Sequence, residues 1–293
     1  ILLGSDNGGT VTPTDGSVTG DKLASTVTTS SNISLDGGTF VFNESGADKD
    51  FRIESDSNTH MLFVDAGNNM IGINESSPSS YYYNDLVVNS GDEGGITIVD
   101  TSGGQSSLAF ADGTSGSARY SGRILYDHST DKMRIGAGGN TYLNIDGNGH
   151  VTNAYQPAFQ VRPSSNQNNM ATSDTIVFGT EVFDQNSDFA SNTFTAPVTG
   201  KYQLSFNIRL QQLQDDSSYA LINIQTSNRT YQHILALAPH VDGDVGYQHF
   251  SNSLLCDMDA NDTAYLVFQE SGGTTGAVDV SATESDFTGF LAC

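Results

Sequence analysis

Alternating apolar and polar residues mark the second half of the chain. The clearest alternation covers residues 201–210 and directly follows a Pro-x-x-Gly turn. Its apolar positions are Tyr202, Leu204, Phe206, Ile208 and Leu210. A period of two predicts a strand with one buried face. Because Val, Ile, Thr, Tyr and Phe are common and turn residues recur at short intervals, an all-β chain is predicted.

Eight strands of this kind are predicted in residues 154–293. They cover residues 154–162, 175–183, 193–210, 218–225, 230–238, 248–258, 263–270 and 286–292, with 193–196 as a short extension of the second strand. The odd-numbered connections are long and polar: 163–174, 211–218, 239–247 and 271–285. In a jelly roll of alternately running strands, these loops share one end, and the tight turns and both termini share the other. Binding is expected at the long-loop end.

Short hairpins recur in residues 51–153. The segments 61–74 and 141–153 each contain an apolar strand, an Asp, a Gly/Asn turn and a second apolar strand, and 123–136 is a third relative. Asn and Gly supply the positive φ that a tight hairpin turn needs. Because such hairpins are too small to be stable alone, they are predicted either to stack on neighbouring repeats or to intertwine with other copies of the chain.

Three regions follow from these patterns. Residues 1–50 are polar and rich in Gly, Ser and Thr, and are predicted to form an extended N-terminal shaft segment that depends on other copies for its order. Residues 51–153 are predicted to form a shaft of β-hairpins, in which Tyr81–Tyr83 is interpreted as an interchain packing patch. The longer, more apolar strands of residues 154–293 predict a jelly-roll knob.

The C-terminal region resembles the trimeric jelly-roll heads of complement-q and tumour-necrosis-factor type proteins. The resemblance rests on the ordered segments AFQV (158–161), VFDQNSDF (182–189), FTAPVTGKYQLSF (194–206), ANDTAYLVF (260–268) and FTGFLA (287–292). The candidate core and fold positions are Asn186, Phe194, Pro197, Gly200, Tyr202, Leu204, Phe206, Phe287 and Gly289. The resemblance implies a homotrimer packed around a threefold axis. No ligand carries over, because the loops 241–247 and 271–280 match no particular branch of the family.

Residues 10–153 resemble the shafts of tailed-phage fibres, especially those of aquatic phages. The segments that carry this resemblance are TPTDGSVTGDKLAS, FRIESDSNTHMLFVDAGNNMIGIN and YDHSTDKMRIGAGGNTYLNIDGNGHVTN. Fibres of this class are trimers whose N-terminus points toward the particle. The resemblance therefore implies an extracellular virion protein of the tail. It would join other tail or baseplate proteins through its N-terminal end and attach to a host-surface glycan or protein through its knob.

The composition of the chain mainly excludes classes of function. The chain has 34 acidic and 11 basic residues and a formal net charge of −23, whereas nucleic-acid binding needs a basic footprint. No apolar run reaches the ~18 residues of a membrane span, so neither nucleic acid nor membrane insertion is expected. Cys256 and Cys293 are predicted to be unpaired thiols. The start Ile-Leu-Leu, without Met or a signal-peptide n-region, is interpreted as a mature piece or the ordered part of a longer protein.

Catalytic motifs are missing from the sequence. It contains no Gly-x-Ser-x-Gly, His-Glu-x-x-His, P-loop or Cys–His pairing. A polysaccharide-cutting fibre would need two carboxylates at a defined separation, normally on a larger β-helix. The histidines are expected in surface or edge positions: His60, His128, His150, His233, His240 and His249. The protein is therefore predicted not to be an enzyme.

Candidate binding residues lie in the long loops of the predicted knob. They are Asn168, Asn169, Asp215, Asp216, Tyr219, His240, Asp242, Asp244 and Tyr247. Aromatic and amide side chains suit stacking on sugars and hydrogen bonding to hydroxyls, but loop residues without a role would have the same composition. Asp242 and Asp244 are also candidates for a calcium site, because hard cations prefer several oxygen ligands. Solvated acidic loops are the alternative interpretation, and no other cofactor is expected.

Two rival functions remain open from the sequence. A purely structural virion fibre, such as a head decoration or a collar fibre, would use the knob only to cap and register the trimer. Substitutions in the long loops would then leave host adsorption unchanged. A secreted adhesive protein with the same head is the third interpretation, and a signal peptide in the full gene would favour it.

Overall fold

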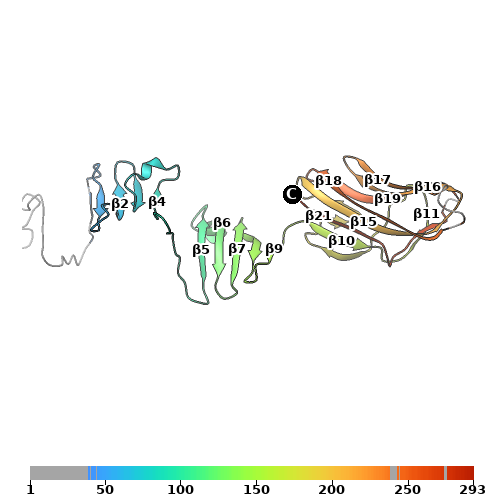
Figure 1. Cartoon of the computed structure of the whole chain (residues 1–293), viewed down its shortest axis with the longest axis horizontal. Helices are drawn as coiled ribbons and strands as arrows, with labels where there is room; N and C mark the ends of the chain where they lie inside the picture. Colours follow the sequence, from blue (N-terminus) through green and yellow to red (C-terminus); the bar gives the residue numbers. More distant parts are fainter. Residues whose placement is uncertain (1–38, 40, 44, 238–242, 244, 274–275) are drawn as a thin grey trace, which may run out of the picture. The chain divides into compact units, whose positions relative to one another are not determined.

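The computed structural model describes residues 39, 41–43, 45–237, 243, 245–273 and 276–293. Within them the chain forms β-strands, two short 3-10 helices and no α-helix (Figure 1). The predicted all-β class is therefore confirmed. The chain divides into two compact units, one ending at Thr97 and one beginning at Ile98. Most of the N-terminal segment predicted for residues 1–50 lies outside the described residues.

The first unit contains a four-stranded sheet in the order β1-β2-β3-β4. Its elements are β1 (Phe51–Ile53), β2 (Leu62–Asp65), β3 (Met70–Ile73), the 3-10 helix η2 (Pro78–Ser80) and β4 (Leu86–Val88). β2 and β3 form the hairpin predicted for residues 61–74. The side chain of Asp65 closes its turn by accepting a hydrogen bond from Asn68 N (2.9 Å), and Asn69 adopts a φ of 58°. β3 and β4 are parallel. Tyr82 and Tyr83 stay almost fully exposed within the chain.

The second unit begins with an antiparallel meander, here called the shaft sheet. Its elements are β5 (Gln105–Phe110), η3 (Gly116–Tyr120), β6 (Gly122–Asp127), β7 (Lys132–Ala137), β8 (Asn140–Ile145) and β9 (Val151–Asn153). The hairpins predicted for residues 123–136 and 141–153 both form. Tight hairpin turns need residues with positive φ, and Asp131 and Gly149 adopt φ values of 48° and 85° in these two turns.

The two faces of the shaft sheet differ sharply. On the first, called the apolar face, two cross-strand rows contain Leu108, Ile124, Ile135 and Leu143, and Tyr126, Met133, Ile145 and Val151. Within the single chain Leu108, Ile124, Ile135 and Val151 are 54%, 42%, 44% and 61% exposed. On the opposite, polar face the register aligns Arg134 with Asn144 and Thr152. A sheet this apolar on one side is expected to be covered by a partner.

Asp127 makes the shaft sheet sensitive to acid. Its carboxylate is 4% exposed and accepts hydrogen bonds from Ser129 Oγ (2.6 Å) and Gln105 Nε2 (3.1 Å). Together with the Arg134 guanidinium, these donors lower the pKa of Asp127 from the ordinary 3.8 to about 2. Because the folded pKa is the lower one, this stabilisation is present above about pH 4 and is lost as the pH falls toward 2.

We therefore expect Asp127→Asn to flatten the dependence of shaft-sheet stability on pH between about 4 and 2. Carboxyl NMR titration of the full chain should place the Asp127 midpoint near 2. Asp85, whose carboxyl lies in the other unit, is a control site for the same substitution. A midpoint for Asp127 at the ordinary value would contradict the role given to its donors.

The head is a sandwich of two antiparallel sheets (Figure 1). The first has the order β11-β20-β15-β21-β10-β12, with β18 also paired to β15. Its strands are β10 (Ala158–Arg162), β11 (Gln167–Met170), β12 (Thr180–Asp184), β15 (Gly200–Leu213), β18 (Val245–Met258), β20 (Val278–Val280) and β21 (Asp286–Leu291). The second has the order β13-β14-β19-β16-β17. Its strands are β13 (Phe189–Ala190), β14 (Thr193–Thr195), β16 (Ser217–Thr226), β17 (Thr230–Ala236) and β19 (Thr263–Gly272).

The core of the head lies between these two sheets. The strand β15, predicted from alternation, buries Tyr202, Leu204, Phe206, Ile208 and Leu210 to 3% exposure or less. Phe194 and Phe287 are fully buried as well. Gly289 is required by packing, because a Cβ there would lie 2.6 Å from both Leu204 Cδ2 and Phe159 Cε1. Gly200 faces a similar limit at Leu291 Cδ1 (2.6 Å), whereas Pro197 is exposed in its turn.

Several predicted strand bounds were wrong. Of the strand predicted over residues 175–183, only residues 180–183 pair with β10, as part of β12. The chain crosses between sheets before them, since Thr175 bridges to Val267 of the second sheet. Residues 193–196 do not extend that strand, since β14 pairs with β13 and β19. The predicted loop 211–218 is mostly strand, and only Gln214–Asp216 connects β15 to β16. The cause in each case is pairing with a distant strand.

Candidate functional site at the distal end of the head

Strand pairing defines two ends of the head. Leu213 pairs with Val245, Tyr219 with Ser271, and Met170 with Val278. We call this end, formed by residues 167–170, 214–219, 245–247, 271–273 and 276–280, the distal end. At the opposite, proximal end Lys201 N donates to Cys293 O (2.7 Å) and Leu291 N to Pro157 O (3.0 Å). The described parts of the four predicted long connections therefore meet at one end, away from both termini of the head.

Asn168 and Asn169 lie in a strand, which corrects their predicted loop position. They belong to β11, which pairs with β20, and both are exposed. Asp279 of β20 is only 8% exposed and holds this tip together. Its carboxylate accepts hydrogen bonds from Asn169 N (2.8 Å) and from Gln212 Nε2 (2.6 Å). The amide side chains are thus presented from a fixed backbone rather than from a free loop.

Asp215 and Asp216 are exposed in the three-residue turn between β15 and β16. Next to them, Ser217 is fully buried and donates a hydrogen bond from Oγ to Glu270 Oε1. Burial raises the pKa of Glu270, and the charge of Asp216 raises it further. Asp215, Asp216 and Glu270 therefore concentrate acidic side chains in this corner of the distal end. The hydrogen bond from Ser217 orients the carboxyl group of Glu270.

The two candidate tyrosines differ in exposure. Tyr219 lies near the start of β16 and is half-buried, whereas Tyr247 of β18 is 66% exposed. Arg209 lies over the Tyr247 ring, with its Cζ 4.7 Å from the ring centroid, and pairs with Glu284 Oε2 at 2.8 Å. Hydrogen bonds to Thr283 and Ser281, together with Arg209, lower the pKa of Glu284. Tyr247 is consequently a fixed aromatic surface at the distal end.

His240, Asp242 and Asp244 lie outside the described residues, so their predicted part in receptor or calcium binding stays a prediction. Among the residues that the structure describes, no group of three His, Cys, Asp or Glu side chains is arranged to hold a metal ion. Both cysteines are free thiols, as predicted, with Cys256 buried and Cys293 exposed. Burial raises the pKa of Cys256 to about 11, which keeps this thiol protonated and unreactive.

A surface that sequence analysis missed covers the outward side of β15, β18 and β21, and we call it the neutral face. Its side chains are Gln203, Ser205, Asn207, Ser251, Ser253, Leu255, Thr288 and Phe290. They bond across strands: Gln203 Nε2 donates to Ser253 Oγ (2.7 Å), and Ser251 Oγ donates to Asn207 Oδ1 (2.8 Å). Charged side chains border these eight uncharged ones, with Lys201 and Asp257 at one end and Arg209 and Asp286 at the other. In the sequence, most of these side chains occupy the polar positions of the apolar–polar alternation in each strand.

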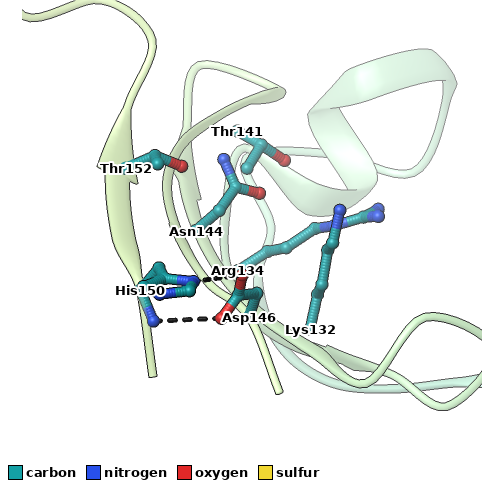
Figure 2. Close-up of a pocket in the computed structure, with 7 residues that line it drawn as sticks. All are labelled: Lys132, Arg134, Thr141, Asn144, Asp146, His150 and Thr152. Carbon is teal, nitrogen blue, oxygen red and sulfur yellow. Dashed lines mark hydrogen bonds and ion pairs between the residues drawn. The ribbon is translucent and has the colours of Figure 1, made fainter. Parts of the chain in front are cut away.

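A second missed feature is a polar pocket on the polar face of the shaft sheet (Figure 2). It lies between β7, β8 and β9, and its lining includes Lys132, Arg134, Asn144 and Thr152. The spacing Lys-x-Arg in a strand puts both basic side chains on one face, and the hairpin register adds the other two. The Lys-x-Arg spacing is visible in the sequence, whereas the register that aligns Asn144 and Thr152 with Arg134 is a property of the folded sheet.

Comparison with known proteins identifies the fold of the head. Residues 158–292 match the family model of the C1q domain. The globular domain of zebrafish complement 1qA protein is similar at 16% identity and a TM-score of 0.35, over 47% of this chain and 98% of that one. Murine APRIL is similar at 8% identity and a TM-score of 0.35, over 46% and 98%. A search of curated proteins gave no match.

The head thus matches the C1q domain family model, in agreement with the jelly-roll head that the sequence resemblance predicted. Domains of this type form homotrimers, are generally non-enzymatic binding modules and are typically extracellular. In the described residues, no helix is long and apolar enough to cross a membrane. The head is consistent with a trimeric adhesive or structural protein.

Proposed function

We propose that this protein is a homotrimeric attachment fibre of a virus particle, with the tail of a bacteriophage as its location. The N-terminal end joins the particle through tail or baseplate proteins, and the distal end of the head contacts a glycan or protein on the host surface. The observation that carries the proposal is the neutral face on a C1q/TNF-like head. The phage assignment rests on the resemblance of residues 10–153 to fibre shafts.

The neutral face is the surface through which three heads associate. Three copies bring a formal charge of −23 each, so charged surfaces would repel at close approach. On this face Phe290, Gln203 and Leu255 form one cross-strand row whose two apolar members are 49% and 54% exposed. Burial of apolar side chains supplies the association energy, and the serines and amides already have hydrogen-bond partners there.

The apolar face of the shaft sheet supports the same assembly independently. It exposes Leu108, Ile124, Ile135 and Val151 in the single chain, and two neighbouring copies provide the cover that a soluble protein needs. Such a shaft holds the three distal ends together. Three weak sites that act at once give avidity without a tight single contact.

The experiment has two steps on the full chain. Light scattering after size-exclusion chromatography should give a homotrimer. Labelled protein should then bind saturably to cells of a susceptible host in a panel of bacteria, and the triple variant Asn168→Ala, Asp216→Ala, Tyr219→Ala should lose most of this binding by losing three contacts per head. Asn228→Ala at the proximal end is the matched control and should bind like the wild type.

The outcomes separate the rival functions. A monomer in solution would overturn the proposal as a whole. A trimer whose binding is unaffected by the triple variant would favour a structural fibre, in which the head only caps and registers the trimer. Loss of binding in chelator would support the cation site predicted at Asp242 and Asp244.

A further inference from the structure

The polar pocket of the shaft sheet has the size of a small-ligand site. Its volume is about 380 Å³, within the range of ~300–1,000 Å³ usual for such sites. All seven side chains that line it are polar, and Figure 2 shows them projecting from three neighbouring strands and a turn. Such a lining offers nothing to an apolar ligand and many hydrogen bonds to a hydroxylated one.

The pocket lies in the most basic part of the chain. Four of the 11 basic residues, Arg119, Arg123, Lys132 and Arg134, fall within sixteen consecutive positions. Arg123 reaches the pocket lining through a hydrogen bond from Nη2 to Thr141 Oγ1 (3.3 Å), and its buried Nε has no partner in the described structure. Lys132 makes no ion pair with any described residue. Lys132 is therefore a cationic donor of the pocket that no ion pair within the described residues neutralises.

The carboxylates near the pocket are already engaged by the protein. Asp146 accepts hydrogen bonds from His150 Nδ1 (3.0 Å), His150 N (3.0 Å) and Asn148 N (2.9 Å). Asp127 pairs with Arg134 Nη2 at 3.1 Å and thereby orients this guanidinium. Asp131 accepts from Tyr126 Oη (3.0 Å). These charges limit how much negative charge a ligand can bring, and they favour a monoanion over a phosphate dianion.

We propose that this pocket binds a carboxylate-bearing saccharide. The carboxylate of the sugar lies between the Lys132 ammonium and the Arg134 guanidinium, which both line the pocket and make charge-assisted hydrogen bonds to it. Asn144, Thr141 and Thr152 then pair with the sugar hydroxyls. This site lies on the face opposite to the apolar face, so it stays open to solvent when copies of the chain cover the latter.

The test is calorimetric titration of the full chain with galacturonic acid, a monoanion, at low salt. We expect saturable binding that Lys132→Gln weakens about tenfold or more, the cost of one charged hydrogen bond. Thr152→Val, which removes a hydroxyl and keeps the charge, should weaken binding to a smaller extent. Lys201→Gln, at an exposed lysine of the head, is the charge-matched control and should leave the affinity unchanged. Thermal unfolding of each variant checks that the shaft sheet is intact.

Galactose, the neutral sugar of the same size, separates the carboxylate from the rest of the sugar. We expect it to bind at least tenfold more weakly than galacturonic acid. Equal affinity for the two sugars, no binding of galacturonic acid, or unchanged affinity in the folded Lys132→Gln variant would each overturn the proposal. These outcomes are independent of the oligomeric state and of cell binding by the distal end.

Discussion

Replacing Phe287 with alanine is expected to lower the free energy of unfolding of the head by about 3–5 kcal/mol, the range for a large buried aromatic side chain. Phe287 is fully buried in β21. Its ring centroid lies 5.1 Å from that of Phe159, 5.9 Å from Phe178 and 6.3 Å from Phe189. These rings come from both sheets and from the crossing segment between them, so the cavity cannot close by the movement of one neighbour.

Urea unfolding of the full chain, followed by tyrosine fluorescence at one fixed protein concentration, measures this loss. The concentration must be constant because association also stabilises the folded state. Ile234→Ala on β17 is the control, since Ile234 is 56% exposed and should change the free energy by no more than about 0.5 kcal/mol. Equal effects of the two substitutions would show that the cluster around Phe287 is not the core of the head.

Replacing Ile135 with aspartate is expected to open the shaft sheet to solvent in the assembled protein. In a trimer joined through the apolar face, each copy loses the ~1.5–3 kcal/mol gained by burying an isoleucine and places a charge beside two others. Backbone amides of β6, β7 and β8 should then exchange with deuterium about ten to a hundred times faster, while the amides of the head keep their protection.

Asn144→Asp introduces the same charge on the polar face of the neighbouring strand and should leave exchange almost unchanged. A positional test complements it: in a Cys293→Ser background, Ile135→Cys should form disulfide-linked dimers between copies on mild oxidation, whereas Asn144→Cys should not. If both aspartate variants behave alike and neither cysteine crosslinks, the apolar face is open in the assembled protein and the shaft does not associate through it.

Local patterns in the sequence were sufficient for much of this fold. The alternation over residues 201–210 predicted the strand β15 and its buried side, because period-two apolar residues can only be buried together on one face. Hairpin turns near Asn69, Asp131 and Gly149 were predictable since the positive φ they need is a property of those residues. The resemblance of residues 158–292 to C1q-type heads came from the same ordered, locally readable segments.

Long-range pairing was outside the reach of such patterns. The strand β11 looked like a polar loop because its Gln-Asn-Asn-Met sequence has no strand signal of its own. It forms by pairing with β20, whose Asp279, 110 residues from Asn169, also accepts a hydrogen bond from Asn169 N. The candidate site therefore differs from the predicted one. Asn168 and Asn169 lie in a strand instead of a loop, and Asp215 and Asp216 lie in a three-residue turn instead of a long loop.

The sequence by itself determined the all-β class, the positions of most strands and turns, and the jelly-roll type of the head, since each depends on residues close together in the chain. Only the tertiary structure decided which faces remain without a partner. The neutral face arises when strands far apart in sequence align in register, and the apolar face and the pocket at Lys132 arise when the consecutive strands of the shaft sheet do so. That alignment places side chains of one kind side by side, and a one-residue shift in it would send each of them to the opposite face.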